Sequence, residues 1–209
     1  MSGQLSAAVR VCNWAKSWAQ LNLQVTWTNW APISALKLWY EANKTNANPP
    51  IPPTPSAGTH IVCYELPMYA AVCAGVLTPA ALIALYKAHW ADNKPWDEIL
   101  MGGWMWHTYD VANHKPTPGA GDIVFFNRMS HVAISTGNSA QPGEIVSLWG
   151  MDTTGIAAGT PIEITTVEAL YASVRQQCAR VRRAEGIGQQ SALGNAIPEL
   201  KIEYTAPPW

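Results

Sequence analysis

Apolar and polar positions follow two different periods, one in each half of the chain. In the first half, apolar residues recur every three to four positions, as expected for helices that pack on one face. This spacing predicts helices over residues 5–20, 33–42, 63–77 and 78–90, and a shorter one from residue 95 that ends at Gly102 and Gly103. Pro67 and Pro79 each lie in the first turn of their predicted helix, where proline is tolerated.

The second half has the shorter apolar runs and the alternation that are typical of strands. Runs bounded by turn residues predict a turn that leads into an apolar strand over 116–126, an alternating strand that ends in a turn over 130–137, and a third strand over 144–150. A helix over 164–174 is predicted from a Thr165-x-x-Glu168 capping box, and residues 177–184 are predicted as a closing strand. Helices followed by antiparallel strands indicate an α+β domain.

A proline-rich segment, NANPPIPPTPSAG at 46–58, separates the first helices from the rest of the chain. It is expected to be an extended, exposed connection. The 45 residues before it are too few for an independent core, so residues 1–45 are interpreted as a helical flank packed on a main domain over 59–184. Residues 185–209 are expected to form a tail that runs over the surface.

The composition indicates a single domain with ample core material and no strong electrostatic partner. The chain has 209 residues, 48% of them hydrophobic and 13% charged, and a net charge of -1. This balance argues against binding to nucleic acid or anionic lipid through phosphate contacts, and Arg180 and Arg182 are interpreted as a solvated strand edge. No apolar run approaches the roughly 20 residues of a membrane span.

The first 20 residues also lack the apolar core of a signal peptide, because Arg10, Asn13 and Lys16 interrupt them. We therefore expect synthesis in the cytoplasm without a signal peptide, and export by another route if the protein acts elsewhere.

The cysteines and histidines show no metal-ligand spacing. The four cysteines are widely separated, at Cys12, Cys63, Cys73 and Cys178. This disfavours a zinc site or a redox dithiol. The nearest metal-like group, His107, Asp110 and His114, lies in a predicted loop without a rigid ligand face. We expect neither a metal nor another cofactor.

Cys63 is the cysteine best placed to act as a nucleophile. It stands where a short strand-like stretch meets the start of a predicted helix, and free N–H groups and the helix dipole there would lower the pKa of its thiol. The same N–H groups can stabilise an oxyanion. Cys73, ten residues further on, lacks this advantage and is expected in the core. His131, which opens a predicted strand, is the candidate base.

The string GDIVFFNRMSHVAISTG, residues 121–137, resembles the strand-turn-strand signature of the NlpC/P60 and CHAP superfamily of papain-like cysteine hydrolases. The informative matches are Gly121, Asp122 and His131. The resemblance extends in outline over 58–183 and implies a papain-like catalytic domain. In that family an upstream cysteine begins a helix, a histidine begins the second strand of a small sheet, and a polar residue on the next strand orients the imidazole.

Carried onto this chain, the resemblance implies that Cys63 is the nucleophile and His131 the general base. The third position falls near Ser147, with Glu144 and Asp152 as acidic alternatives. The context of the nucleophile departs from the Asp-Cys-Ser-Gly pattern of the family, since the chain reads Val-Cys-Tyr-Glu at 62–65. Trp149 and Tyr64 are the candidates for contacting the substrate.

The family also implies a substrate class, the amide bonds of peptidoglycan stem peptides. Without a signal peptide, such an enzyme would be an antibacterial effector toxin that reaches a target cell's periplasm through a machine such as type VI secretion, or a phage lysin. An immunity protein or a secretion carrier would then be its partner.

Two other functions remain open from the sequence. The first is a cysteine protease or deamidase toxin that acts on a cytosolic protein. The second is a non-catalytic, Trp-rich binding module on the same fold, with an inert Cys63.

Overall fold

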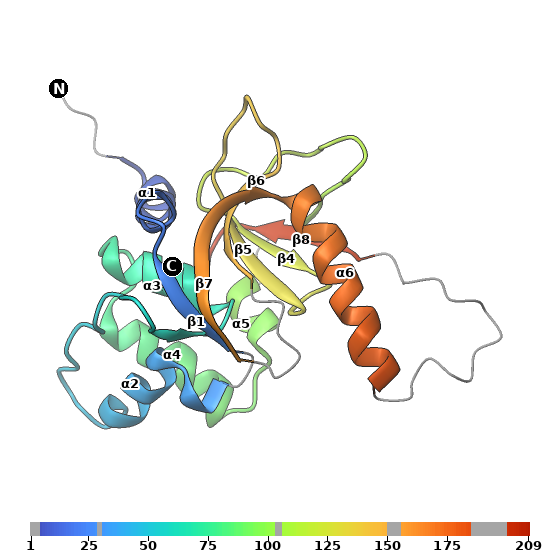
Figure 1. Ribbon diagram of the computed structural model, residues 1–209. Coiled ribbons are helices and arrows are strands. Elements are labelled where there is room, and N and C mark those ends of the chain that lie inside the picture. The colour runs from blue at the N-terminus through green and yellow to red at the C-terminus, as the bar shows by residue number, and fades with distance from the viewer. Residues whose placement is uncertain (1–4, 29–30, 103–105, 150–155, 185–199) are drawn as a thin grey trace.

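The computed structural model describes residues 5–28, 31–102, 106–149, 156–184 and 200–209, which form an α+β domain. One curled, mixed sheet runs through this domain in the order β2-β1-β7-β6-β5-β4-β8-β3 (Figure 1). The strands are β1 (Gln24–Thr28), β2 (His60–Ile61), β3 (His107–Thr108), β4 (Ile123–Phe126), β5 (His131–Ser135), β6 (Glu144–Leu148), β7 (Ile156–Thr166) and β8 (Ile202–Thr205). Neighbouring strands are antiparallel except β1 and β2, which are parallel. The predicted α+β class is confirmed.

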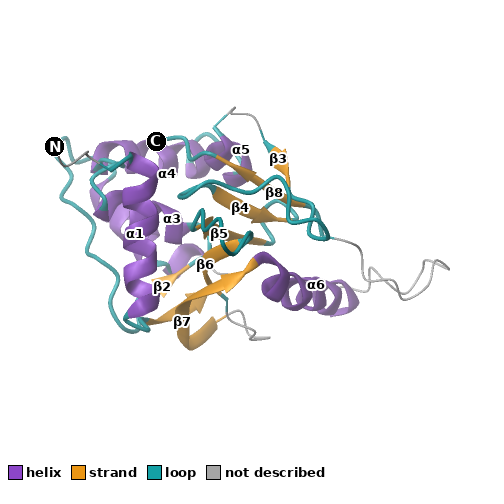
Figure 2. Cartoon of the chain, turned by 90° about the horizontal axis from the view of Figure 1, so that it is seen from above, coloured by secondary structure: helices purple, strands orange, loops and turns teal. Residues whose placement is uncertain are grey.

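The helices cover the two faces of the sheet unequally. They are α1 (Ala7–Gln20), α2 (Ala35–Asn43), α3 (Glu65–Cys73), α4 (Pro79–Trp90), α5 (Trp96–Met101) and α6 (Val167–Ala184), with a short 3-10 helix at Ala31–Ile33. Helices α1 to α5 gather on one side, whereas α6 lies on the other (Figure 2). Within the described ranges, no helix has both the length and the apolar character to cross a membrane.

Alternate residues of the central strands face two separate hydrophobic cores. In β4, Ile123 and Phe125 belong to the core beneath α1 to α5, while Val124 and Phe126 belong to the core beneath α6. All four side chains are completely buried. A strand buried on both faces needs a continuous apolar run, which is the pattern IVFF that predicted it.

The helix boundaries follow the local signals in the sequence. Helix α4 begins at Pro79, and the preceding Thr78 accepts a hydrogen bond from the backbone N–H of Ala81 (3.2 Å) through its Oγ1. Helix α5 ends at Gly102, which has a φ of 54°. Glycine adopts this left-handed conformation without the steric cost of a Cβ, so it terminates the helix as predicted.

The first 45 residues contain a strand as well as the two predicted helices. Residues 24–28, QVTWT, form β1, which lies between β2 and β7 in the sheet and pairs with both. The flank is therefore not a helix bundle alone, because it contributes a strand to the main sheet. The connection over 46–58 contains neither helix nor strand, and most of its residues are exposed.

The prediction of a closing strand at 177–184 is wrong. These residues continue α6, so Cys178, Arg180 and Arg182 lie on a helix. The predicted strand edge with Arg180 and Arg182 on one face is therefore wrong as well. The N-terminal cap of α6 is also shifted by one residue from the predicted box. Thr166, the last residue of β7, accepts through its Oγ1 from the backbone N–H of Ala169 (3.2 Å), and residue 165 lies one position earlier in the strand.

The prediction of a surface tail is also wrong for its last part. Residues 202–205 form β8, which lies between β4 and β3 in the sheet. All four of its residues are buried. The chain therefore does have a closing strand, about 20 residues beyond the segment from which the sequence pattern predicted it.

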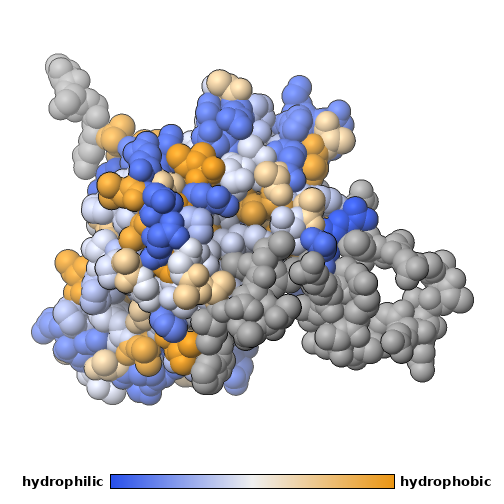
Figure 3. Space-filling model, viewed as in Figure 1, coloured by the Kyte–Doolittle hydropathy of each residue, from blue (hydrophilic) through white to orange (hydrophobic). Residues whose placement is uncertain are grey.

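The exposed large apolar side chains are spread over the molecule. They are Leu5, Trp14, Leu21, Leu38, Ile51, Trp90, Trp106 and Ile164. On the face shown in Figure 3, apolar residues form small groups separated by hydrophilic ones. Isolated apolar residues of this kind are normal on a protein surface.

Candidate active site

Cys63 lies in a tight turn directly before α3. The backbone N–H of Glu65 donates to the carbonyl of Val62 (2.9 Å), and the N–H of Leu66 donates to the carbonyl of Cys63 (3.3 Å). Tyr64 is the N-cap of the helix. The predicted start of the helix at or just after Cys63 is thus confirmed.

Burial controls the chemistry of the Cys63 thiol. The residue is 7% exposed, and this burial raises the pKa of the thiol to about 11. The backbone N–H groups of Val132, Tyr64 and Cys63 itself act in the opposite direction but do not compensate. The expectation of a lowered thiol pKa is therefore wrong. The Val132 N–H that acts on the thiol belongs to β5, the strand that begins with His131.

His131 is completely buried at the first position of β5. Its ring packs against Phe126 and meets Trp149 edge-on, with 4.7 Å between the ring centroids in the second pair. The Nε2 atom lies 2.7 Å from Ser147 Oγ, whereas Nδ1 is buried without a hydrogen-bond partner among the described residues. Burial lowers the pKa of His131 to about 3, so the ring is neutral at pH 7.

Of the three candidates for the third position, Ser147 is the one that contacts His131. It lies on β6, the strand next to β5, and is completely buried. Glu144 accepts hydrogen bonds from Thr136 Oγ1 (2.7 Å) and from the Asn138 side chain (3.2 Å), and so is engaged at the other end of β6. Asp152 lies outside the described residues.

The contact with Ser147 allows either tautomer of the imidazole, because a serine hydroxyl can accept from Nε2 or donate to it. If Nε2 carries the proton and donates it to Ser147 Oγ, the lone pair on Nδ1 is free to accept a proton. A base that acts through Nδ1 needs this tautomer. Ser147 can therefore orient the ring without adding a charge.

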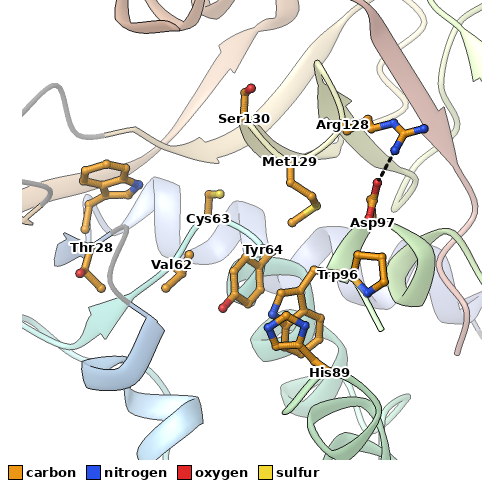
Figure 4. Close-up of a pocket in the computed structure, with 12 residues that line it drawn as sticks. Thr28, Val62, Cys63, Tyr64, His89, Trp96, Asp97, Arg128, Met129 and Ser130 are labelled. Atoms are coloured by element: carbon orange, nitrogen blue, oxygen red, sulfur yellow. Dashed lines mark hydrogen bonds and ion pairs between the residues drawn. The ribbon is translucent and has the colours of Figure 1, made fainter. Parts of the chain in front are cut away.

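A pocket of about 480 Å³ opens beside Cys63. Figure 4 shows Cys63 between Val62 and Tyr64 on one wall, with Met129 and Ser130 facing it from the turn before β5. Tyr64 therefore lines the pocket, as expected of a substrate-binding residue. The ring of Trp149 instead meets that of Trp27, which lines the pocket, at a centroid distance of 6.1 Å.

The far wall of the pocket was not predicted from the sequence. Trp96 stacks on Tyr64 (centroids 4.8 Å apart) and on His89 (4.7 Å). Next to them, the largely buried carboxylate of Asp97 pairs with the exposed guanidinium of Arg128 at 3.4 Å. The helical pattern around residue 96 indicates only a core position, and no local signal in the sequence associates it with Cys63.

The other cysteines have different surroundings. Cys73 is the last residue of α3 and half-buried, with its Sγ 3.8 Å from Thr54 Oγ1. The buried Cys12 of α1 donates to the carbonyl of Thr136 (3.7 Å). The side chain of Cys178 lies outside the described residues.

The three residues of the metal-like group point to different partners. Asp110 caps its own loop by accepting from the backbone N–H groups of residues 112 and 113. His114 pairs with Glu168 (2.8 Å), and His107 stacks on Tyr204. Among the described residues, no cluster of three or more histidine, cysteine or acidic side chains could hold a metal ion.

The burial of His131 predicts a loss of stability in acid. Between its folded pKa of about 3 and the ordinary 6.5, the unfolded chain binds a proton that the folded protein does not, so stability falls as pH falls. Between pH 6.5 and 5, the free energy of unfolding should drop by about 2 kcal/mol more in the wild type than in His131→Asn. Urea titrations at each pH measure this difference, and parallel pH profiles for the two proteins would contradict it.

Comparisons with known proteins give no relative of this chain. No family model matches it, and neither the curated proteins nor the solved structures yield a match.

Proposed function

We propose that the protein is a papain-like cysteine hydrolase that cleaves amide bonds with Cys63 as nucleophile and His131 as base. The observation that carries the proposal is the environment of His131. Ser147 engages its Nε2, its Nδ1 has no hydrogen-bond partner among the described residues, and the backbone N–H of the next residue, Val132, acts on the Cys63 thiol. The candidate nucleophile thus lines a pocket, and the candidate base and the group that orients it lie on the neighbouring strands β5 and β6, of which β5 supplies the Val132 N–H.

In the proposed reaction, the thiol proton moves to His131 Nδ1 while the sulfur attacks the amide carbonyl carbon. The backbone N–H of Cys63 stabilises the negative charge on the carbonyl oxygen. The carbon–nitrogen bond then breaks, and the imidazolium returns the proton to the leaving amine. Water attacks the resulting thioester, His131 accepts a proton from it, and that proton restores the thiol as the acid leaves.

The raised pKa of Cys63 and the lowered pKa of His131 define the resting state of such an enzyme. At neutral pH both groups are uncharged, so the pair starts as a thiol and a neutral imidazole. Proton transfer then accompanies the attack instead of preceding it. A substrate that displaces water from the pocket would meet a nucleophile that is activated only when a carbonyl group is in place.

For the substrate, we propose the peptide stem of bacterial peptidoglycan, on the basis of the resemblance to the NlpC/P60 and CHAP superfamily. The pocket is compatible with a peptide, since it combines aromatic walls with one acidic and one basic group, Asp97 and Arg128. We further propose that the protein is an antibacterial effector toxin acting in the periplasm of a target cell.

Digestion of purified sacculi tests the proposal. We expect the wild type to release stem-peptide fragments, and Cys63→Ala to release at least about a thousandfold less, because covalent catalysis loses its nucleophile. Mass spectrometry of the soluble fragments identifies the cleaved bond. Cys73→Ala is the matched control and should retain activity. Fragments from Cys63→Ala at the wild-type rate would refute the assignment.

The same site would serve a protease or deamidase that acts on a cytosolic protein. Directed expression in bacteria separates the two substrate classes. A wall hydrolase should be toxic only when it is sent to the periplasm, whereas a toxin with a cytosolic target should be toxic without export.

A second candidate function is a non-catalytic binding module. The observation that favours it is the burial of both reactive groups, with a thiol pKa of about 11 and a histidine pKa of about 3. In an inert module, iodoacetamide would alkylate Cys63 slowly at pH 7, and His131→Ala would not change that rate. A rate that depends on His131 would count against the module.

A further inference from the structure

A single buried carboxylate joins the Cys63 turn to two other parts of the fold. Glu65, the first residue of α3, is completely buried. Its Oε1 accepts from Ser34 Oγ (2.6 Å) and from the hydroxyl of Tyr86, and its Oε2 accepts from the backbone N–H of Val62 (3.1 Å). Since Ser34 precedes α2 and Tyr86 belongs to α4, this side chain connects three segments that are far apart in the sequence.

The carboxylate also lies at the N-terminal end of α2. Ser34 is the N-cap of this helix, but its hydroxyl donates to Glu65 and does not cap its own helix. The backbone N–H of Lys37, in the first turn of α2, also interacts with Glu65. A helix N-terminus favours a negative charge, which helps to explain why a carboxylate is tolerated in this core.

Glu65 holds Val62, the residue before the proposed nucleophile, at both ends. The N–H of Val62 donates to the Glu65 side chain, and its carbonyl accepts from the Glu65 backbone N–H. Cys63 lies within the loop that these two hydrogen bonds close. The direction of its side chain therefore depends on the Glu65 carboxylate.

We propose that Glu65 is a positioning residue, which fixes the Cys63 turn for reaction through its hydrogen bond to the Val62 N–H. It touches neither the pocket nor the sulfur in the described contacts, so it acts through the backbone of the turn. The consequence for catalysis rests on the proposed function. Its effect on the thiol, however, can be measured without any substrate.

The charge of Glu65 gives the proposal a signature that packing alone would not produce. Glu65 raises the pKa of Cys63, and burial raises its own pKa to about 7. The titratable and polar groups that face it from the surrounding elements are Cys63, Tyr64, Tyr69, Tyr86, the Ser34 hydroxyl and the Lys37 backbone N–H. Of these groups, only the Cys63 thiol reacts in the proposed hydrolysis.

Glu65→Gln and Glu65→Ala separate the position of the turn from its charge. A glutamine keeps an oxygen for the Val62 N–H, and its amide group can donate to the hydroxyls of Ser34 and Tyr86, which can both turn to accept. Glutamine therefore keeps the hydrogen bond to the Val62 N–H and removes the charge. Alanine removes both the hydrogen bond and the charge.

The experiment measures the rate of iodoacetamide alkylation of Cys63 between pH 6 and 10, resolved by mass spectrometry of the Cys63 peptide. We expect Glu65→Gln to shift the profile to lower pH and to raise the rate at pH 8 about threefold to tenfold, because a neighbouring negative charge is lost. Glu65→Ala should differ from Glu65→Gln by at least about fivefold, because the turn is no longer held. Ser34→Ala, which removes a different bond to the same carboxylate, should stay near the wild-type rate.

Equal rates for the glutamine and alanine variants would overturn the positioning role, and so would a Ser34→Ala profile that matches Glu65→Ala. If Glu65→Ala does not fold, Glu65→Asp takes its place, because it keeps the charge but is too short to hold the Val62 N–H in the same way, and a wild-type profile for Glu65→Asp contradicts the proposal. On sacculi, Glu65→Ala should lower kcat with little change in KM, and Glu65→Gln should largely restore it. A shifted alkylation profile in a protein without hydrolase activity would refute the proposed function and leave this inference in place.

Discussion

Gly121→Ala is expected to destabilise the protein by about 3 kcal/mol or more, from a combination of backbone strain and overpacking. Gly121 has a φ of 84°, a conformation that residues with a Cβ rarely adopt. A Cβ at this position would lie 2.4 Å from the carbonyl oxygen of Ala8 and 2.8 Å from its carbonyl carbon. Both atoms belong to the backbone of α1, so the helix itself would have to move away from the sheet. Urea unfolding measures the loss.

Gly58→Ala is the matched control for this substitution. Gly58 has a similar φ of 77°, but a Cβ there would meet nothing within 4 Å. It should therefore cost only about 1 kcal/mol, the conformational part of the effect. Equal losses in the two variants would show that the close approach of α1 to Gly121 contributes nothing to stability.

His131→Ala should reduce the hydrolysis of sacculi by about a thousandfold, the scale of a missing general acid–base catalyst. The expected loss follows from the proposed function, in which Nδ1 takes and returns every proton of the cycle. Single-turnover rates on a soluble fragment of the sacculus measure it. An active His131→Ala protein would exclude the proposed mechanism.

Ser147→Ala should have a smaller effect, about tenfold, because the ring keeps its packing but loses the hydrogen bond at Nε2 that orients it. Ser135→Ala provides the comparison. Ser135 is a buried serine on β5 whose hydroxyl donates to the carbonyl of Pro118 (3.2 Å), away from His131. Equal losses of activity in the two serine variants would show that the contact with Nε2 has no special role.

The parts of the fold that the sequence predicts well are those with a local cause. The turn at 127–130 separates two apolar runs that pair directly, from Ile123 with Ile134 to Phe126 with His131. The ends of α4 and α5 follow from Thr78, Pro79 and Gly102, whose conformational preferences act within one turn of helix.

The parts that the sequence does not predict depend on contacts between distant segments. Strand β1 pairs with β7, which is more than 100 residues away in the sequence, with Gln24 opposite Pro161. The QVTWT segment itself lies between two segments with a helical pattern, so no local signal predicts a strand there. The apolar and polar residues of 177–184 fit both the helical repeat and the alternation of a strand. The helix that begins at Val167 continues through them.

The sequence predicts which elements carry Cys63 and His131, but not the surroundings of either side chain. The sequence placed Cys63 at a helix start and His131 at a strand start, and both placements are local properties. The pKa of each group is set instead by burial from α1 to α5 and the sheet, which no local pattern contains. The wall formed by Trp96 and Asp97 is likewise a product of tertiary packing.

The place of β8 in the sheet has a consequence for biosynthesis. Its residues, 202–205, fill the gap between β4 and β3, so a nascent chain on the ribosome displays β4 with one open edge until this segment emerges. An unpaired apolar strand is a site at which chains associate with one another. The pairing of β1 with β7 likewise waits until residues 156–166 have been made. A nascent chain that has not yet reached residues 202–205 would thus carry an unpaired apolar strand, so association between such chains would compete with correct folding.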